Sequence, residues 1–244
     1  MFRFRSNMVG LDPSPPLSLM LQKTLLYLFD PWCGLCYAAA PALDALTNDS
    51  SIELMLLPSG LFTGRGARPQ NREWAEYAWS NDQRIEALTG QVFSEAYRQQ
   101  VLLGPHGSFD SGPMTRALTL ARGLDRRLEL PLLHHFQRQR YIDGRETSSA
   151  RVAAAITSGF LERHGYASDP VVFAEQLNAD DALALLACER IDETQRMMES
   201  EQVRGVLKLY LQTAGQLQPV SSEVLYQGAD AVLEAIAVMR QMPA

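Results

Sequence analysis

The sequence predicts an α/β fold in which strands from both ends of the chain form one sheet, interrupted by a long helical segment. Strand, helix and strand come near the start, a helical period fills the middle, and two strands and a helix come at the end. The chain has 244 residues, 46% of them hydrophobic, which is enough for a sizeable core. We expect an irregular extension (1–22), a sheet domain made of 23–65 and 201–244, and an all-helical insertion domain (66–200).

The first elements follow from two short apolar runs. Lys23 to Asp30 is bounded by charges and predicts a buried strand, and Ile52 to Leu57 predicts a second one that closes at Pro58-Ser59-Gly60. Between them, Tyr37 to Leu46 is rich in alanine and predicts a helix with a kink at Pro41, because proline lacks the N–H group that an internal turn needs. This order is typical of a right-handed βαβ unit.

The middle of the chain, from about Gln70 to Ser200, shows helical period and no convincing strand. Ser111-Gly112-Pro113 and Asp169-Pro170 are typical helix starts, with proline in the first turn. Trp74 and Trp79 fall on the core side of one helix, and packing there is favoured over lining a substrate groove.

The last part predicts a β-hairpin followed by a helix. Its strands are expected over Val206 to Leu211 and Val220 to Tyr226, joined by a turn that contains Ala214-Gly215. Gly228 and Asp230 then open the final helix. The residues expected on its inner face are Val232, Leu233, Ile236 and Ala237.

The reactive residues are concentrated in Trp32-Cys33-Gly34-Leu35-Cys36-Tyr37, at the turn from strand to helix. Two of the three cysteines lie here, and a helix N-terminus favours a thiolate at Cys33. We expect Cys33 to be the accessible nucleophile and Cys36, one helical turn further, to be the buried resolving thiol. Trp32 and Tyr37 are expected to shape access to Cys33. The pattern predicts a thiol–disulfide oxidoreductase, and a pair of buried, inert cysteines is the alternative.

Composition and charge argue against several other classes. The net charge is −6 and the basic residues are scattered, so nucleic acid is not an expected partner. Three cysteines, with four histidines that lack ligand spacing, give neither a zinc site nor a disulfide framework, and no metal is expected. The stretch 1–22 is interrupted by Asp12 and prolines, so we expect no signal peptide, no membrane partner and a cytoplasmic location, with Met20 as a possible start.

Three other positions have competing interpretations. Cys188 is expected to be a buried core thiol on a helix face with Ala187, and a regulatory thiol is the alternative. His134 and His135 are expected to be a solvated or hydrogen-bonded pair. Asp30 is a minor candidate for a proton acceptor near the cysteines, or a cap of the strand end.

The motif Trp32 to Cys36, followed by Pro41, resembles the active-site turn of thioredoxins, with Leu35 where thioredoxin has proline. The order of elements from Lys23 to Met242 is similar to the DsbA-like family. Short segments further resemble its predicted bacterial protein-disulfide isomerase branch. These segments are Asp30-Pro31, Leu61-Phe62, Thr89-Gly90-Gln91-Val92-Phe93, Tyr141-Ile142-Asp143-Gly144-Arg145 and Arg204-Gly205-Val206.

The resemblance implies a thioredoxin-like fold with a helical insertion, and thiol–disulfide oxidoreductase or disulfide isomerase activity at Cys33 and Cys36 without metal or organic cofactor. Protein or small-molecule disulfides are the implied substrates, and glutathione or a thioredoxin-type protein is the implied reductant. Gly34 and Leu35 occupy the positions that tune the nucleophile in this family. The oligomeric state is not indicated.

The family also has a cis-proline in the loop that faces the thiols, and the alignment places Leu207 there, after Val206. A cis bond costs roughly 2.5–4 kcal/mol before other residues, against roughly 0.5–1 kcal/mol before proline. We therefore expect a trans bond between Val206 and Leu207, a reshaped substrate loop and altered exchange activity.

Two other functions remain open. A glutathione-dependent transferase or isomerase of the kappa type shares the split architecture, but it usually has serine at the nucleophile position and no second thiol, so Cys33 and Cys36 argue against it. The second open function is that of a non-catalytic binding or chaperone module with the same fold. Insulin reduction distinguishes the leading function, and glutathione affinity distinguishes the kappa type.

Overall fold

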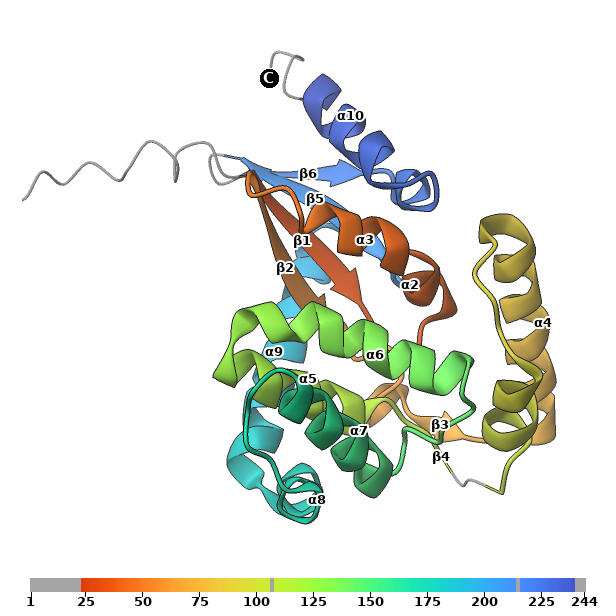
Figure 1. The fold of residues 1–244 in the computed structure, drawn as a ribbon. Coiled ribbons are helices and arrows are strands. Elements are labelled where there is room, and N and C mark those ends of the chain that lie inside the picture. Colours follow the sequence, from red (N-terminus) through yellow and green to blue (C-terminus); the bar gives the residue numbers. More distant parts are fainter. Residues whose placement is uncertain (1–22, 106–107, 214–215, 240–244) are drawn as a thin grey trace, which may run out of the picture.

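A computed structural model describes residues 23–105, 108–213 and 216–239, so the predicted extension 1–22 and the turn at 214–215 lie outside the described residues. One four-stranded sheet, in the order β2-β1-β5-β6, lies at the centre of the thioredoxin-like part (Figure 1). β1 runs parallel to β2 and antiparallel to β5, which pairs antiparallel with β6. The strands are β1 (Lys23–Phe29), β2 (Ile52–Pro58), β5 (Lys208–Thr213) and β6 (Gln216–Val220).

β1 is buried on both faces, which explains its continuous apolar sequence. Leu25 and Tyr27 belong to the main core, beneath the helices that follow β1 and end the chain. Leu26 and Leu28 point to the opposite face, where Tyr210 joins them in a smaller cluster. The alternation has the period of two that a strand imposes.

The helix predicted after the cysteines is present in two pieces, α2 (Gly34–Ala38) and α3 (Ala40–Leu46). Pro41 lies in the first turn of α3, where its missing N–H group leaves no bond unmade. The expected kink is therefore confirmed.

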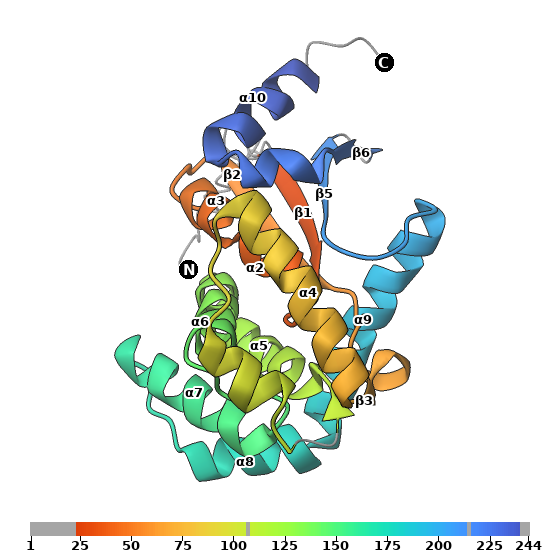
Figure 2. The same ribbon diagram turned by 90° about the vertical axis from the view of Figure 1, so that its right-hand side faces the viewer.

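The segment between β2 and β5 is mostly helical. Figure 2 shows α4 running past α2, while α5 to α8 occupy the lower part of the molecule and α9 leads from them towards β5. The helix starts predicted at 111–113 and 169–170 are confirmed, since α5 begins at Gly112 and α8 at Pro170. The elements are η1 (Gly64–Gly66), α4 (Arg72–Thr89), the π-helix η2 (Tyr97–Leu102), α5 (Gly112–Leu124), η3 (Arg126–Leu128), α6 (Glu129–Tyr141), α7 (Ala150–Arg163), α8 (Pro170–Ala179) and α9 (Asp181–Ser200).

Two expectations about strands were wrong. A short ribbon pairs β3 (Arg68–Pro69) with β4 (Ser108–Phe109), so the middle of the chain is not free of strands. The second strand of the hairpin ends at Val220, and the apolar stretch expected to continue it is the 3-10 helix η4 (Ser222–Tyr226). A short apolar run does not by its period distinguish a strand from a buried helical turn.

The final helix, α10 (Ala229–Met239), is where the sequence predicts it. Val232 and Ile236 are fully buried, whereas Ala237 is exposed. No helix in the described ranges is long and apolar enough to cross a membrane.

Candidate active site

The two cysteines of the motif lie at the end of β1, in different surroundings. Cys33 is the residue before the first turn of α2, with extended backbone, and its carbonyl accepts a hydrogen bond from the N–H of Tyr37 at 3.0 Å. Both residues are buried, but Cys33 keeps 8% of its surface exposed, against 1% for Cys36. Both are free thiols. Cys33 is thus the more accessible of the two, in the order that the sequence predicts.

A cavity of about 380 Å³ opens at Cys33. Its walls come from α2, the loop after β2, the β3–β4 ribbon and α4, with Val206 at one side. Gly34 and Leu35 also line it, whereas Cys36, Tyr37 and Leu207 do not. A substrate in this cavity would meet Cys33 first.

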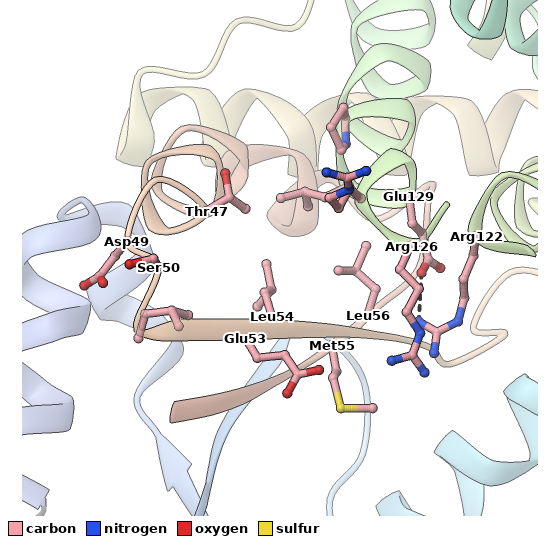
Figure 3. Close-up of a pocket in the computed structure, with 14 residues that line it drawn as sticks. Thr47, Asp49, Ser50, Glu53, Leu54, Met55, Leu56, Arg122, Arg126 and Glu129 are labelled. Carbon is pink, nitrogen blue, oxygen red and sulfur yellow. Dashed lines mark hydrogen bonds and ion pairs between the residues drawn. The ribbon is translucent and has the colours of Figure 1, made fainter. Parts of the chain in front are cut away.

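A larger cavity, of about 560 Å³, lies away from the thiols between β2 and the α5–α6 region (Figure 3). Its wall includes the consecutive residues 52–56 of β2 and the ion pair of Arg122 with Glu129, at 3.1 Å. No cysteine lines it. It therefore has no part in thiol chemistry.

Cys36 is packed behind Cys33. Burial raises the pKa of the Cys36 thiol, and the hydrogen bond and charge interaction with Cys33 raise that pKa further. The hydroxyl of Tyr27, which is also fully buried, donates to the backbone carbonyl of Cys36 at 3.3 Å. Cys36 is therefore held as a protonated thiol until Cys33 has reacted.

The loop that precedes β5 faces Cys33, as the resemblance implies. The thiol of Cys33 donates to the carbonyl oxygen of Val206 over 3.9 Å. The Val206-Leu207 peptide bond is cis, so the expectation of a trans bond was wrong. Tertiary contacts override the local preference, because Leu207 is buried and its carbonyl accepts from the hydroxyl of Ser222 at 3.2 Å. We expected a reshaped loop and altered activity because we expected a trans bond, and the structure therefore does not support either expectation.

Asp30 is fully buried directly after β1. Its carboxylate accepts from the N–H of Trp32 and the N–H of Phe62, both at 3.0 Å, and from the hydroxyl of Ser111 at 3.1 Å. Burial raises its pKa to about 6, against the lowering effect of these three donors. Asp30 thus caps the strand end and ties it to two other segments, and a role as proton acceptor stays a prediction.

Trp32 and Tyr37 lie on different sides of the motif. Trp32 lines the cavity, with its ring edge-to-face against Phe109 at 4.5 Å between centroids. Tyr37 points away from it, stacked on Tyr141 at 4.7 Å, and its hydroxyl donates to the carbonyl of Val92. Only Trp32 therefore bounds the space in front of Cys33.

The structure adds Asp82, which sequence reasoning missed. This carboxyl group of α4 is 6% exposed, lines the cavity and accepts a hydrogen bond from the hydroxyl of Tyr97 at 3.0 Å. Burial raises its pKa to about 7, although Tyr97 and the charge of Arg140 act in the opposite direction. A β-carbon on Gly34 would lie 2.6 Å from Oδ1 of Asp82, so the glycine allows α2 to approach α4. In the sequence, only the glycine at position 34 could have indicated this close approach of α2 to Asp82.

Arg68 of β3 is a second residue that the sequence did not indicate. Its guanidinium lies over the rings of Trp74, at 4.5 Å, and Phe62, at 5.5 Å, and all three side chains line the cavity. We predicted that Trp74 packs in the core. In the structure Trp74 is half-buried and also forms part of the cavity wall, so that prediction covers only part of its role.

Cys188 is exposed on α9, so the expectation of a buried thiol was wrong. Leu183 and Ala187 take the buried positions of this helix, and Cys188 follows one residue later on a different side. His134 and His135 are hydrogen-bonded as expected, His134 to Asp44 and His135 to Arg163. In the described parts of the chain, no group of three or more His, Cys, Asp or Glu residues is placed to hold a metal ion.

Solved structures with the same fold carry related chemistry. The cytosolic disulfide reductase DsbM from Pseudomonas aeruginosa is 28% identical, with a TM-score of 0.74 over 90% of this chain and 100% of its own. The chain thus shares its fold, over nearly its whole length, with a disulfide reductase of the DsbA-like type. It is accordingly a thiol–disulfide oxidoreductase with a Cys33–Cys36 pair. No protein-family model matches the sequence, and a search of curated proteins finds no match.

Two further solved structures extend this comparison. DsbM in a structure with GSH is 27% identical, with a TM-score of 0.71 over 89% of this chain and 99% of that one. A protein of Nitrosomonas europaea, classed provisionally as a protein disulfide isomerase, is 18% identical, with a TM-score of 0.68 over 90% of this chain and 98% of its own. The latter shows the fold alone.

Proposed function

We propose that this chain is a cytosolic thiol–disulfide reductase in which Cys33 attacks the substrate disulfide and Cys36 resolves the mixed disulfide. One observation carries this assignment: Cys33 opens into the cavity while Cys36 is packed behind it, out of reach of a substrate. Attack by an accessible thiol and resolution by a buried neighbour is the sequence of events that this arrangement favours.

The reaction has two exchange steps. The Cys33 thiolate attacks one sulfur of the disulfide, forms a mixed disulfide, and releases the other half as a thiolate that takes a proton from water. Cys36 then loses its proton and attacks the sulfur of Cys33, releasing the second half. The substrate gains two electrons, and the enzyme is left with a Cys33–Cys36 disulfide.

Glutathione is the proposed reductant. Two molecules of the thiol would restore the enzyme, the first as a mixed disulfide with Cys33 and the second by releasing glutathione disulfide. DsbM, a cytosolic disulfide reductase with a structure that contains GSH, supports this choice of reductant and of compartment. Small-molecule or protein disulfides are the proposed substrates.

Turnover of 2-hydroxyethyl disulfide, with glutathione as reductant, tests the proposal. We expect Cys33→Ser to abolish turnover, and Cys36→Ser to accumulate a glutathione adduct at Cys33 that mass spectrometry detects. Cys188→Ser is the matched control, because Cys188 is exposed on α9 and does not line the cavity at Cys33.

Three outcomes would contradict the assignment. Full turnover by Cys33→Ser would show that another group is the nucleophile. Glutathione binding without any disulfide reduction would favour an enzyme of the kappa type. Absence of both would favour a binding or chaperone module.

A further inference from the structure

Arg68 brings a positive charge into the cavity without a negative partner. Its guanidinium lies over two aromatic rings that contact each other, those of Trp74 and Phe62, and its Nε is buried with no hydrogen-bond partner. Among the described residues, none forms an ion pair or a hydrogen bond with this guanidinium. A charged side chain that is partly buried usually has a partner of opposite charge. The Arg68 guanidinium has none among the described residues, so an anion from outside the chain could take that place.

The surroundings of Arg68 do not neutralise it. A second guanidinium, that of the fully buried Arg140, lies 3.6 Å from the ring centroid of Trp32, but it is ion-paired with Glu146 at 3.8 Å and does not line the cavity. Asp82 is the buried carboxyl group that lines the cavity, and its raised pKa, about 7, leaves it only partly ionised at neutral pH. Arg68 is therefore the one cationic side chain among the described residues that line the cavity, in a chain whose net charge is −6.

The aromatic rings also fix the orientation of the guanidinium. Because Trp74 and Phe62 stack against it, Arg68 has fewer conformations to lose when an anion binds. A planar guanidinium that is held in place matches the two oxygens of a carboxylate. The β3–β4 ribbon, in which Arg68 pairs with Phe109, holds the backbone of this residue at the cavity.

We propose that Arg68 binds a carboxylate of the substrate, so that the enzyme prefers disulfides of small acidic thiols. This specificity rests on the proposed disulfide exchange at Cys33, which lines the same cavity. A volume of about 380 Å³ is at the small end of ligand sites, which span roughly 300–1,000 Å³, and suits a thiol of peptide size better than a folded protein segment.

Two disulfides that differ in charge test the proposal, each reduced with dithiothreitol, a reductant without carboxylates, in place of glutathione. Glutathione disulfide carries carboxylates, whereas 2-hydroxyethyl disulfide carries no charge. In Arg68→Met we expect the KM for glutathione disulfide to rise roughly 10- to 100-fold with little change in kcat, because a charged hydrogen bond to the substrate is lost. Turnover of 2-hydroxyethyl disulfide should stay the same.

Two further variants sharpen the test. Arg68→Lys keeps the charge but not the planar fork, so its KM for glutathione disulfide should lie between those of the wild type and Arg68→Met. Arg65→Met is the matched control, because Arg65 is exposed on the neighbouring η1 turn and does not line this cavity. It should leave both substrates unaffected. An equal loss with both disulfides in Arg68→Met would make Arg68 a structural residue and overturn the proposal.

A binding measurement separates this proposal from the proposed function. Glutathione and its diethyl ester, which lacks free carboxylates, are titrated by calorimetry into the Cys33→Ser/Cys36→Ser double variant. We expect glutathione to bind more tightly than the ester, and Arg68→Met to remove that difference. Equal affinities would overturn carboxylate recognition even if disulfide turnover is normal. If the wild type reduces no disulfide, the proposed function fails, and the titration still decides the role of Arg68.

Discussion

Two buried carboxyl groups lie on either side of the dithiol turn, one from each part of the molecule, and they are held differently. Asp30, at the end of β1, accepts three hydrogen bonds, one from its own segment and two from the segments of Phe62 and Ser111. Asp82, on α4, accepts one from the hydroxyl of Tyr97, and its Oδ1 lies against Gly34 with no donor among the described residues. The sheet part thus uses its carboxyl group to join segments, whereas the insertion leaves one with unused bonding capacity beside the cavity.

The two parts of the chain contribute different groups to the site: one contributes the reacting thiols and the other contributes residues that line the cavity. The thioredoxin-like part supplies the reacting groups, Cys33 and Cys36, together with the Val206 carbonyl. The insertion supplies Asp82 and Arg68, which face the space that a substrate would occupy. Chemistry and recognition therefore come from different parts of one chain.

The largest expected effect is on the carboxyl group that joins segments. Asp30→Ala leaves the N–H groups of Trp32 and Phe62 and the hydroxyl of Ser111 without their acceptor. We expect the free energy of unfolding in urea to fall by roughly 3–5 kcal/mol, because each buried unsatisfied donor costs roughly 1–3 kcal/mol. Asp30→Asn keeps one acceptor oxygen and should lose less. A loss below about 1 kcal/mol in Asp30→Ala would show that water replaces the carboxylate.

The next effect concerns the pH dependence of stability. The pKa of Asp82 is raised from 3.8 to about 7 in the folded protein, so the folded state binds the proton more tightly than the unfolded state. The contribution of protonated Asp82 to the free energy of unfolding is fully present below about pH 4. It is lost as the pH rises to about 7. The loss is of the order of 4 kcal/mol, because each pKa unit corresponds to about 1.4 kcal/mol.

Asp82→Asn removes this titration and should flatten the curve of unfolding free energy against pH. Above pH 7, the variant should gain stability relative to the wild type. Asp30→Asn is the matched control, because the pKa of Asp30 is raised to about 6 and its removal should leave the transition of Asp82 in place. Identical curves for Asp82→Asn and the wild type would show that Asp82 ionises normally in the folded state.

The smallest expected effect concerns the contact between the two parts. Gly34→Ala places a β-carbon 2.6 Å from Oδ1 of Asp82 and 3.1 Å from Cδ1 of Ile85. We expect a loss of about 1–3 kcal/mol in thermal unfolding and a slower exchange rate, because α2 must move away from α4. Gly123→Ala is the control, since a β-carbon there meets nothing within 4 Å, and it should stabilise α5 by about 0.5–1 kcal/mol. Equal stability of both variants would show that α4 yields without cost.

The sequence correctly predicted those elements that depend only on residues close together in the chain. The apolar run of β1, the kink at Pro41 and the start of α8 at Pro170 each depend on a few neighbouring residues. The same holds for the order of burial of Cys33 and Cys36, which follows from one helical turn.

The rest of the site depends on contacts across long sequence separations. Asp82 and Arg68 reach the cavity through α4 and the β3–β4 ribbon, whose strands have two residues each and leave no periodic signal. The geometry of the Val206-Leu207 bond was missed for a similar reason. A rule for isolated peptide bonds contains nothing about the burial of Leu207 or the hydroxyl of Ser222.

The strand order has a consequence for the growing chain on the ribosome. β1 and β2 are made early, yet the other edge of β1 pairs with β5, which is synthesised about 150 residues after β2. Until then, that edge of β1 has unpaired backbone groups, and Cys33 lacks the Val206 carbonyl that later faces it. During synthesis the dithiol therefore exists before its surroundings do, and a chaperone that covers strand edges would protect it at that stage.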